Sequence, residues 1–172
     1  IPIRAGDDAG LLPVPGWDSR HEWDGWIPFD KLPQTYNPPS GYVVTANNRV
    51  VDEKYLYLLS NDWAPPFRAQ RITDLIQQMS SGGEKLSVAS MQAIQADQTS
   101  AQIQELLPLL LKIEPVGDRE KQAFTYLQDW KGDTGRDSVA TTIYETWFIY
   151  LGRAMVADDL HGDLYKQMAD RS

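Results

Sequence analysis

The sequence predicts an α+β fold, in which short strands and loops come first and a mostly helical region follows. Two observations carry this prediction. Nine of the 11 prolines and four of the six tryptophans lie before position 67, where glycine and aspartate interrupt short apolar stretches. Beyond that point the apolar residues recur with the period of an amphipathic helix, and proline, which helix interiors exclude, becomes rare. We therefore expect a loop-and-strand segment at 1–66 and a helical region at 67–172.

The first segment contains two candidate strands or turns, at 42–44 and 55–59, both short and apolar. Proline-rich connections separate them, and a two-stranded hairpin alone is marginally stable in water. We therefore expect this segment to complete a sheet that is formed by sequence outside this chain.

The clearest helix is predicted at 68–79. Its apolar residues are spaced as one helical stripe and are expected to be buried: Ile72, Leu75, Ile76 and Met79. The serines and glycines at 80–83 are interpreted as the signal that ends this helix.

Four more helices are predicted from the same period and from capping residues at their ends. The first two are expected to begin near Ser87 and near Ser100, and the second of these to bend at Pro108. The third is expected to have Asp118 as its N-cap and to stop at Gly132. The fourth is expected to start after Ser138 and to continue toward Leu160. Their inward-facing residues are expected to be Val88, Met91 and Ile94; Ile103, Leu106, Leu107 and Leu110; Ala123, Tyr126, Leu127 and Trp130; and Val139, Ile143, Trp147, Tyr150 and Leu151.

Composition excludes several classes of function. A formal net charge of -8 repels a phosphate backbone, so we expect no nucleic-acid partner. No apolar run approaches the roughly 20 residues that cross a bilayer, so we expect no membrane span. With no cysteine and only two distant histidines, His21 and His161, the sequence offers no thiol nucleophile and no local zinc site.

Serine-hydrolase motifs are also missing from the sequence. There is no Gly-x-Ser-x-Gly elbow, and Ile1 has no nucleophilic side chain. The acidic pairs at 7–8, 52–53 and 158–159 are interpreted as solvated surface. Trp17, Trp23 and Trp26 are either a sugar-stacking platform or, in the favoured interpretation, residues that pin irregular loops onto a core.

The most informative segment is 37–49, which is interpreted as a turn, a short apolar strand and then two consecutive amides, Asn47 and Asn48. An amide side chain at a strand end can donate an N–H to a developing oxyanion without titrating, which suits acyl transfer. The alternative, which composition alone favours, is an Asn-Asn turn closed by hydrogen bonds from side chain to backbone.

An ordered set of motifs resembles the penicillin acylase (penicillin amidase) family of N-terminal-nucleophile hydrolases. The resemblance follows the family's large chain over nearly the whole sequence, and the ordered set is specific although each motif is short. The matching stretches are 16–17, 22–29, 32–33, 37–41, 47–49, 61–72 and 91–97, with weaker matches at 127–132 and 137–147.

The resemblance implies part of an N-terminal-nucleophile hydrolase fold and a precursor that is cut into a small and a large chain. The new N-terminal serine of the large chain is the nucleophile and its own α-amino group is the base, so no histidine is needed. This chain would then be an internal fragment of one larger catalytic chain, without the nucleophile. The family's oxyanion-hole asparagine falls on Asn47, with Asn48 as the one-residue alternative. Its active-site arginine falls on Arg71, with Arg68 as the second choice.

The implied function is that of a segment of an amidohydrolase that cleaves a linear acyl-amide bond in a small acylated-amine substrate. The substrate of the parent is left open among β-lactam side chains, acyl-homoserine lactones and other acylated amines. The implied partners are the remainder of the large chain and the small chain of the same precursor, in a periplasmic or secreted location. An alternative from another class is a non-catalytic helical binding or scaffolding module that reuses the fold, which the absence of an upstream Gly-Ser processing junction would favour.

The sequence implies no cofactor. Some family members bind calcium through an aspartate that lies between the asparagine and the arginine. That place falls here near Leu58 or Ser60, neither of them acidic, although Asp52 and Asp62 are close. Calcium in the intact parent is therefore not supported by this segment.

The isolated 172-residue chain is expected not to hydrolyse phenylacetyl or long-chain acyl amides, because Ile1 stands where a Ser, Thr or Cys nucleophile would be needed. Amine release by the purified chain measures this. Turnover that survives removal of contaminants, and that is abolished by replacing one of the chain's own internal residues, would contradict the assignment.

Overall fold

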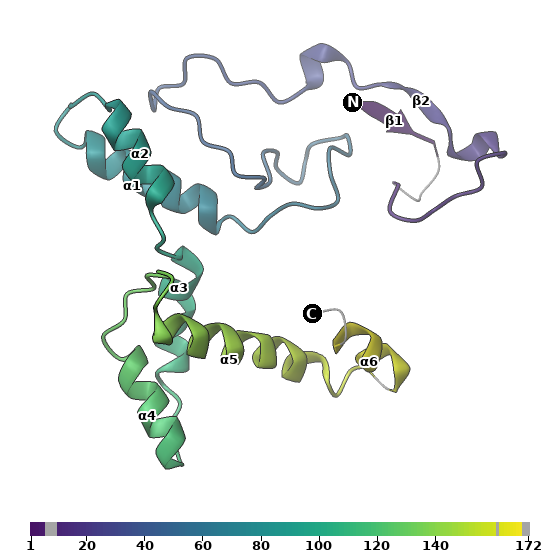
Figure 1. The fold of residues 1–172 in the computed structure, drawn as a ribbon. Coiled ribbons are helices and arrows are strands. Elements are labelled where there is room, and N and C mark those ends of the chain that lie inside the picture. The colour runs from purple at the N-terminus through teal and green to yellow at the C-terminus, as the bar shows by residue number, and fades with distance from the viewer. Residues whose placement is uncertain (6–9, 161, 170–172) are drawn as a thin grey trace. The chain divides into compact units, whose positions relative to one another are not determined.

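The computed structural model describes residues 1–5, 10–160 and 162–169, and within them two short strands precede a series of helices (Figure 1). This mixed content agrees with the α+β prediction. The elements are β1 (Pro2–Arg4), β2 (Trp23–Trp26), α1 (Phe67–Ser80), α2 (Val88–Ala96), α3 (Ala101–Leu110), α4 (Asp118–Leu127), α5 (Val139–Val156) and α6 (Asp163–Ala169), with short 3-10 helices at Ser19–His21 and Phe29–Lys31.

Two compact units divide the chain, Ile1–Thr73 and Asp74–Ser172, and their boundary falls within α1. The division expected from the sequence, at 1–66 and 67–172, stays a prediction. Among the described helices, none is long and apolar enough to cross a membrane. His161 and the acidic pair at 7–8 lie outside the described residues.

The first unit contains a two-stranded antiparallel sheet of β1 and β2. Its register pairs Pro2 with Trp26 and has an irregularity before the pair of Arg4 and Trp23. At the end of the ladder the Ile27 N–H donates to the Ile1 carbonyl oxygen at 3.0 Å. Ile27 is the one fully buried residue among those described in this unit, so the sheet encloses very little core.

The strand expected at 42–44 is wrong, and the stretch at 55–59, expected as a short strand or turn, contains no strand either. A short apolar run becomes a strand only when a neighbouring strand supplies a hydrogen-bonded ladder, and β1 and β2 pair with each other instead. Few residues in β1 and β2 are typical of strands. One begins at Pro2, which is tolerated at a strand start, and the other contains Gly25 at φ +89°.

The favoured interpretation of the tryptophans is also wrong for the described residues. Trp17, Trp23 and Trp26 are 90%, 57% and 62% exposed, so they do not pin loops onto a core. The rings of Trp23 and Trp26 meet edge to face with centroids 5.4 Å apart. A sheet of two short strands has too little surface to cover these rings.

The helix expected at 68–79 is confirmed as α1, and its stop signal works as predicted. Gly83 adopts φ +78° and donates its N–H to the Ser80 carbonyl oxygen at 3.0 Å. Leu75 is buried, whereas the rest of the stripe is only half-buried, namely Ile72, Ile76 and Met79.

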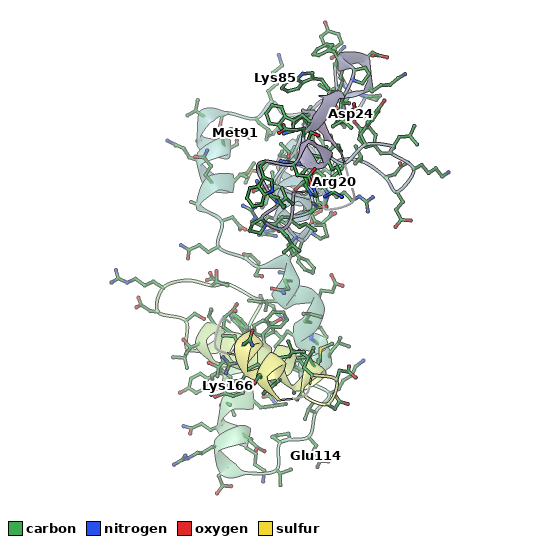
Figure 2. All side chains as sticks on the ribbon, turned by 90° about the vertical axis from the view of Figure 1, so that its right-hand side faces the viewer. Arg20, Asp24, Lys85, Met91, Glu114 and Lys166 are labelled. Atoms are coloured by element: carbon green, nitrogen blue, oxygen red, sulfur yellow. The ribbon has the colours of Figure 1, made fainter. Side chains whose placement is uncertain are left out.

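The helix expected near Ser87 is confirmed as α2, which Ser87 caps in a reciprocal capping box with Ser90. Only part of the face that was expected to be buried is shielded from solvent. Ile94 is half-buried, but Val88 is 77% exposed and Met91, labelled in Figure 2, is 40% exposed. An apolar face is buried only where another element covers it, and the described residues do not cover this one.

The core of the second unit lies where α3, α4 and α5 contribute their apolar faces. Its fully buried members are Ile103, Leu107, Leu110, Leu127, Ala140 and Tyr144. The Tyr144 ring lies among Trp130, Trp147 and Phe148, with centroid distances of 5.8, 5.5 and 6.1 Å. Its hydroxyl is buried without a hydrogen-bond partner among the described residues, and this burial raises the pKa of the phenol.

The starts of α3 and α5 agree with prediction, since Ser100 and Ser138 accept N–H bonds as N-caps. Pro108 lies inside the last turn of α3, where the predicted bend stays a prediction. The start of α4 needs a correction, because Gly117 and not Asp118 is the N-cap. The Glu120 carboxylate accepts from the Gly117 and Val116 N–H groups, and these bonds lower the pKa of Glu120.

The predicted ends of α4 and α5 are also wrong. The fourth helix ends at Leu127 and not at Gly132. The residues after Leu127 form a turn, in which the Trp130 indole donates to the Asp133 carbonyl oxygen at 2.9 Å. The fifth ends at Val156 instead of continuing toward Leu160, and α6 was not predicted. In α4 and α5, three residues expected to face inward are exposed, namely Tyr126, Val139 and Tyr150.

Gly132→Ala is expected to lower the free energy of unfolding by about 1–3 kcal/mol, because positive φ strains any residue with a Cβ. At φ +81° the added Cβ would also lie 3.2 Å from both the Ile103 Cγ2 and the Ser100 carbonyl oxygen. The matched control is Gly152→Ala in α5, where nothing lies within 4 Å, and this change is expected to raise stability by about 0.5–1 kcal/mol. Urea unfolding followed by far-UV circular dichroism measures both, and equal stability of the two variants would contradict the packing described.

Candidate active site

The two predicted amides lie in an irregular loop that is pinned to the segment preceding α1. The Ala64 N–H donates to the Asn47 carbonyl oxygen at 2.9 Å, and Asn48 forms an isolated parallel bridge with Ala64. Asn47 has φ +62°, in the left-handed region that asparagine tolerates better than most residues. The expectation that the amides stand at the end of a strand is therefore wrong, since this bridge positions them.

The Asn48 side chain is used to close the turn. Its Oδ1 accepts the Ala46 N–H at 3.0 Å, and its Nδ2 donates to the Arg49 carbonyl oxygen at 3.1 Å. Both ends of this amide are therefore engaged with nearby backbone, as the turn interpretation of the sequence expected for the pair. For Asn48 that interpretation describes the geometry well.

The Asn47 side chain has different surroundings. It is exposed, and its Oδ1 accepts a hydrogen bond of 2.7 Å from the Nη2 of Arg68, the second residue of α1. The same Nη2 donates to the Ala46 carbonyl oxygen at 2.8 Å. A guanidinium has donors and no acceptor, so the amide end that it meets must be the oxygen. The donating Nδ2 is the other end of the Asn47 amide.

Arg71 lies one turn after Arg68 on α1 and is half-buried. The structure brings Asn47 together with Arg68, the second choice for the site arginine, and the approach of Arg71 to Asn47 stays a prediction. One feature of the sequence favours Arg68. It is a cation in the first turn of a helix that has no acidic residue there, a position that the helix dipole disfavours.

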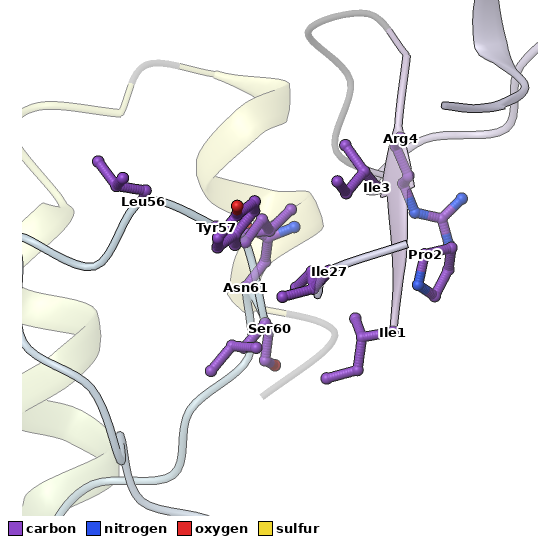
Figure 3. A pocket seen from close by; sticks show the side chains of 11 residues that line it. Ile1, Pro2, Ile3, Arg4, Ile27, Leu56, Tyr57, Ser60 and Asn61 are labelled. Atoms are coloured by element: carbon purple, nitrogen blue, oxygen red, sulfur yellow. The ribbon is translucent and has the colours of Figure 1, made fainter. Parts of the chain in front are cut away.

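A cavity of about 550 Å³ lies in the first unit (Figure 3). Figure 3 shows the Ile27 side chain between the β1 strand and the segment that carries Ser60 and Asn61. The cavity is lined by Ile1–Arg4, Ile27 and residues 56–61, and so by neither Asn47 nor Arg68. It is therefore a separate feature from the paired amide and guanidinium.

Asp52 and Asp62, the acidic residues close to the place where some family members carry a calcium-binding aspartate, take part in local turns. The Asp52 Oδ1 accepts the Lys54 N–H at 3.0 Å, and the Asp62 N–H donates to the Ser60 hydroxyl at 3.0 Å. Over the described ranges, no group of three or more histidine or acidic side chains is arranged to hold a metal ion.

Comparison with known proteins gives consistent matches. A family profile described as penicillin amidase matches residues 1–172. The penicillin acylase 2 proenzyme of a Pseudomonas species is 34% identical over 158 residues, which cover 91% of this chain and 20% of that protein. An acyl-homoserine lactone acylase of Pseudomonas fluorescens is 33% identical over 165 residues, which cover 88% of this chain and 20% of that protein.

A shorter and more similar match is the penicillin G acylase of Escherichia coli, which is 49% identical over 47 residues, or 27% of this chain and 5% of that protein. The chain spans 20% of the length of the first two relatives.

Proposed function

Because the chain belongs to the penicillin amidase family, as its motifs predicted, we propose that it is a segment of an amidohydrolase that cleaves a linear acyl-amide bond. The nucleophile in this proposal is an N-terminal serine that lies outside these 172 residues. The serine oxygen attacks the amide carbonyl carbon while its own α-amino group takes the hydroxyl proton. Collapse of the tetrahedral intermediate breaks the C–N bond, and the ammonium group returns the proton to the leaving amine. Water then hydrolyses the acyl ester.

The contribution of this chain is the Asn47 side chain, whose Nδ2 donates to the oxyanion of the tetrahedral intermediate. The observation that carries this assignment is the difference between the two asparagines. Both ends of the Asn48 amide are engaged with nearby backbone, whereas Asn47 has its oxygen on Arg68 and is exposed. A fixed donor aimed at the place where charge develops stabilises the transition state more than the ground state.

We assign Arg71 the role of orienting groups around the nucleophile. It follows Arg68 by three residues on α1, and residues at this spacing lie on one face of a helix. Its long side chain can extend past the border of the apolar stripe that Leu75 occupies. Two guanidinium groups near the start of a helix create a positive potential, which favours a developing oxyanion.

The partners in this proposal are the remainder of the large chain and the small chain of the same precursor. This is supported by the proenzyme among the relatives and by the 20% of its length that the chain spans. The substrate is a small acylated amine, in keeping with relatives whose names specify penicillin and acyl-homoserine lactones. The periplasmic or secreted location stays a prediction.

In the intact parent enzyme, Asn47→Gly is expected to lower kcat by about 10²–10³-fold with little change in KM, since a donor to the transition-state oxygen is lost. Glycine is the suitable replacement because Asn47 has φ +62°, where the Cβ of alanine adds backbone strain that glycine avoids. Asn47→Ala should show the same loss of kcat with a somewhat lower yield of processed enzyme.

The matched control is Asn48→Ala, which removes a turn-closing side chain next to the site and is expected to have a milder effect on kcat. Steady-state kinetics on the processed enzymes measures all three variants. If Asn48→Ala lost turnover and Asn47→Gly kept it, the oxyanion role would pass to Asn48; if neither variant lost turnover, the role would be wrong for both.

A further inference from the structure

We propose that Arg68 is a positioning residue for Asn47, which holds the amide oxygen so that the amide nitrogen faces the oxyanion. This inference rests on the proposed oxyanion role of Asn47 and adds a residue that acts through it. In this arrangement Arg68 does not contact the substrate. Its contribution is to fix the orientation of the Asn47 amide, so that Nδ2 and not Oδ1 faces the oxyanion.

The geometry ties the guanidinium to both the backbone and the side chain of the loop. Nη2 carries two N–H groups, and it has two acceptors, the Ala46 carbonyl oxygen at 2.8 Å and the Asn47 Oδ1 at 2.7 Å. The first bond anchors the guanidinium beside the loop, and the second fixes the amide relative to that anchor. Bonds from a charged donor are stronger than those between neutral groups.

The amide needs such a tie because rotation about its last side-chain bond has only a broad, roughly two-fold preference. A half-turn of the Asn47 amide exchanges Nδ2 and Oδ1 and leaves the backbone unchanged. In the wrong orientation a carbonyl oxygen would face the developing negative charge and repel it. Because a guanidinium cannot accept a hydrogen bond, Arg68 is satisfied in one orientation only, the one that presents Nδ2.

The position of Arg68 in α1 is a second, independent observation. The partial positive charge at a helix N-terminus disfavours a cation in the first turn, and α1 has no acidic residue there to offset it. A locally unfavourable choice of this kind is typical of functional positions. The same charge polarises the Asn47 amide through Oδ1, which makes the Nδ2 hydrogens better donors.

A purely structural role would also explain the bond to Ala46, so the test must separate the two. In the processed parent enzyme, Arg68→Ala is expected to lower kcat about 10- to 100-fold, less than loss of the donor itself, with KM within about threefold. Arg68→Lys, which keeps the charge and some donors, is expected to retain more turnover than Arg68→Ala. The matched control is Arg49→Ala, which removes a nearby loop cation bonded to the Asp52 carbonyl oxygen and should leave kcat within about twofold of the parent.

The decisive measurement is the double variant with Asn47→Gly. If Arg68 acts through Asn47, adding Arg68→Ala to Asn47→Gly lowers kcat no further. A full, multiplicative loss in the double variant, or normal kcat in Arg68→Ala alone, would overturn the positioning role while leaving the oxyanion role of Asn47 intact. Normal kcat in Asn47→Gly alone would instead remove the proposed function on which the inference rests.

Processing of the precursor is followed in every variant by the appearance of the two mature chains. If Arg68→Ala is not processed, Arg68→Lys carries the test, and its smaller loss of kcat must likewise vanish in the Asn47→Gly background. A loss of kcat in Arg68→Lys that persists unchanged in that background would overturn the proposal.

Discussion

The backbone hydrogen bond from the Ala64 N–H to the Asn47 carbonyl oxygen, 2.9 Å long, is the constraint on which the candidate site depends. It holds the amide loop against the segment that leads into α1. Asn47 and Arg68 are 21 residues apart in sequence, and this constraint keeps them within hydrogen-bond distance. In this arrangement the Asn47 backbone adopts the left-handed conformation, which is strained for most residues and less so for asparagine.

Two adjacent asparagines of identical chemistry have different roles because they meet different groups. Both ends of the Asn48 amide form hydrogen bonds within the turn, whereas the Asn47 amide oxygen accepts a hydrogen bond from the guanidinium of Arg68. In this chain Asn47 and Arg68 are both exposed, so water competes for the hydrogen bond between them. Once the remainder of the proposed precursor excludes water, the same oriented donor would act at a lower dielectric and stabilise an oxyanion more strongly.

Local signals in the sequence predicted the helices well. Ser87, Ser100 and Ser138 were visible as caps because capping depends on residues within one turn. The strands were misplaced because pairing partners are set by the tertiary fold, which a short apolar run does not encode. The motif made Asn47 a candidate for the site, but its bond to Arg68 accompanies a left-handed backbone and a long-range bridge to Ala64 that no local pattern indicates.

The most direct test of the account is a crystal structure of the intact parent enzyme with a tetrahedral phosphonate or boronate adduct on its N-terminal nucleophile. The Asn47 Nδ2 is expected about 2.7–3.1 Å from the adduct oxygen that represents the oxyanion, with Oδ1 of the same amide held by Arg68. An Asn47 side chain directed away from that oxygen, or Asn48 in its place, would contradict the proposed role.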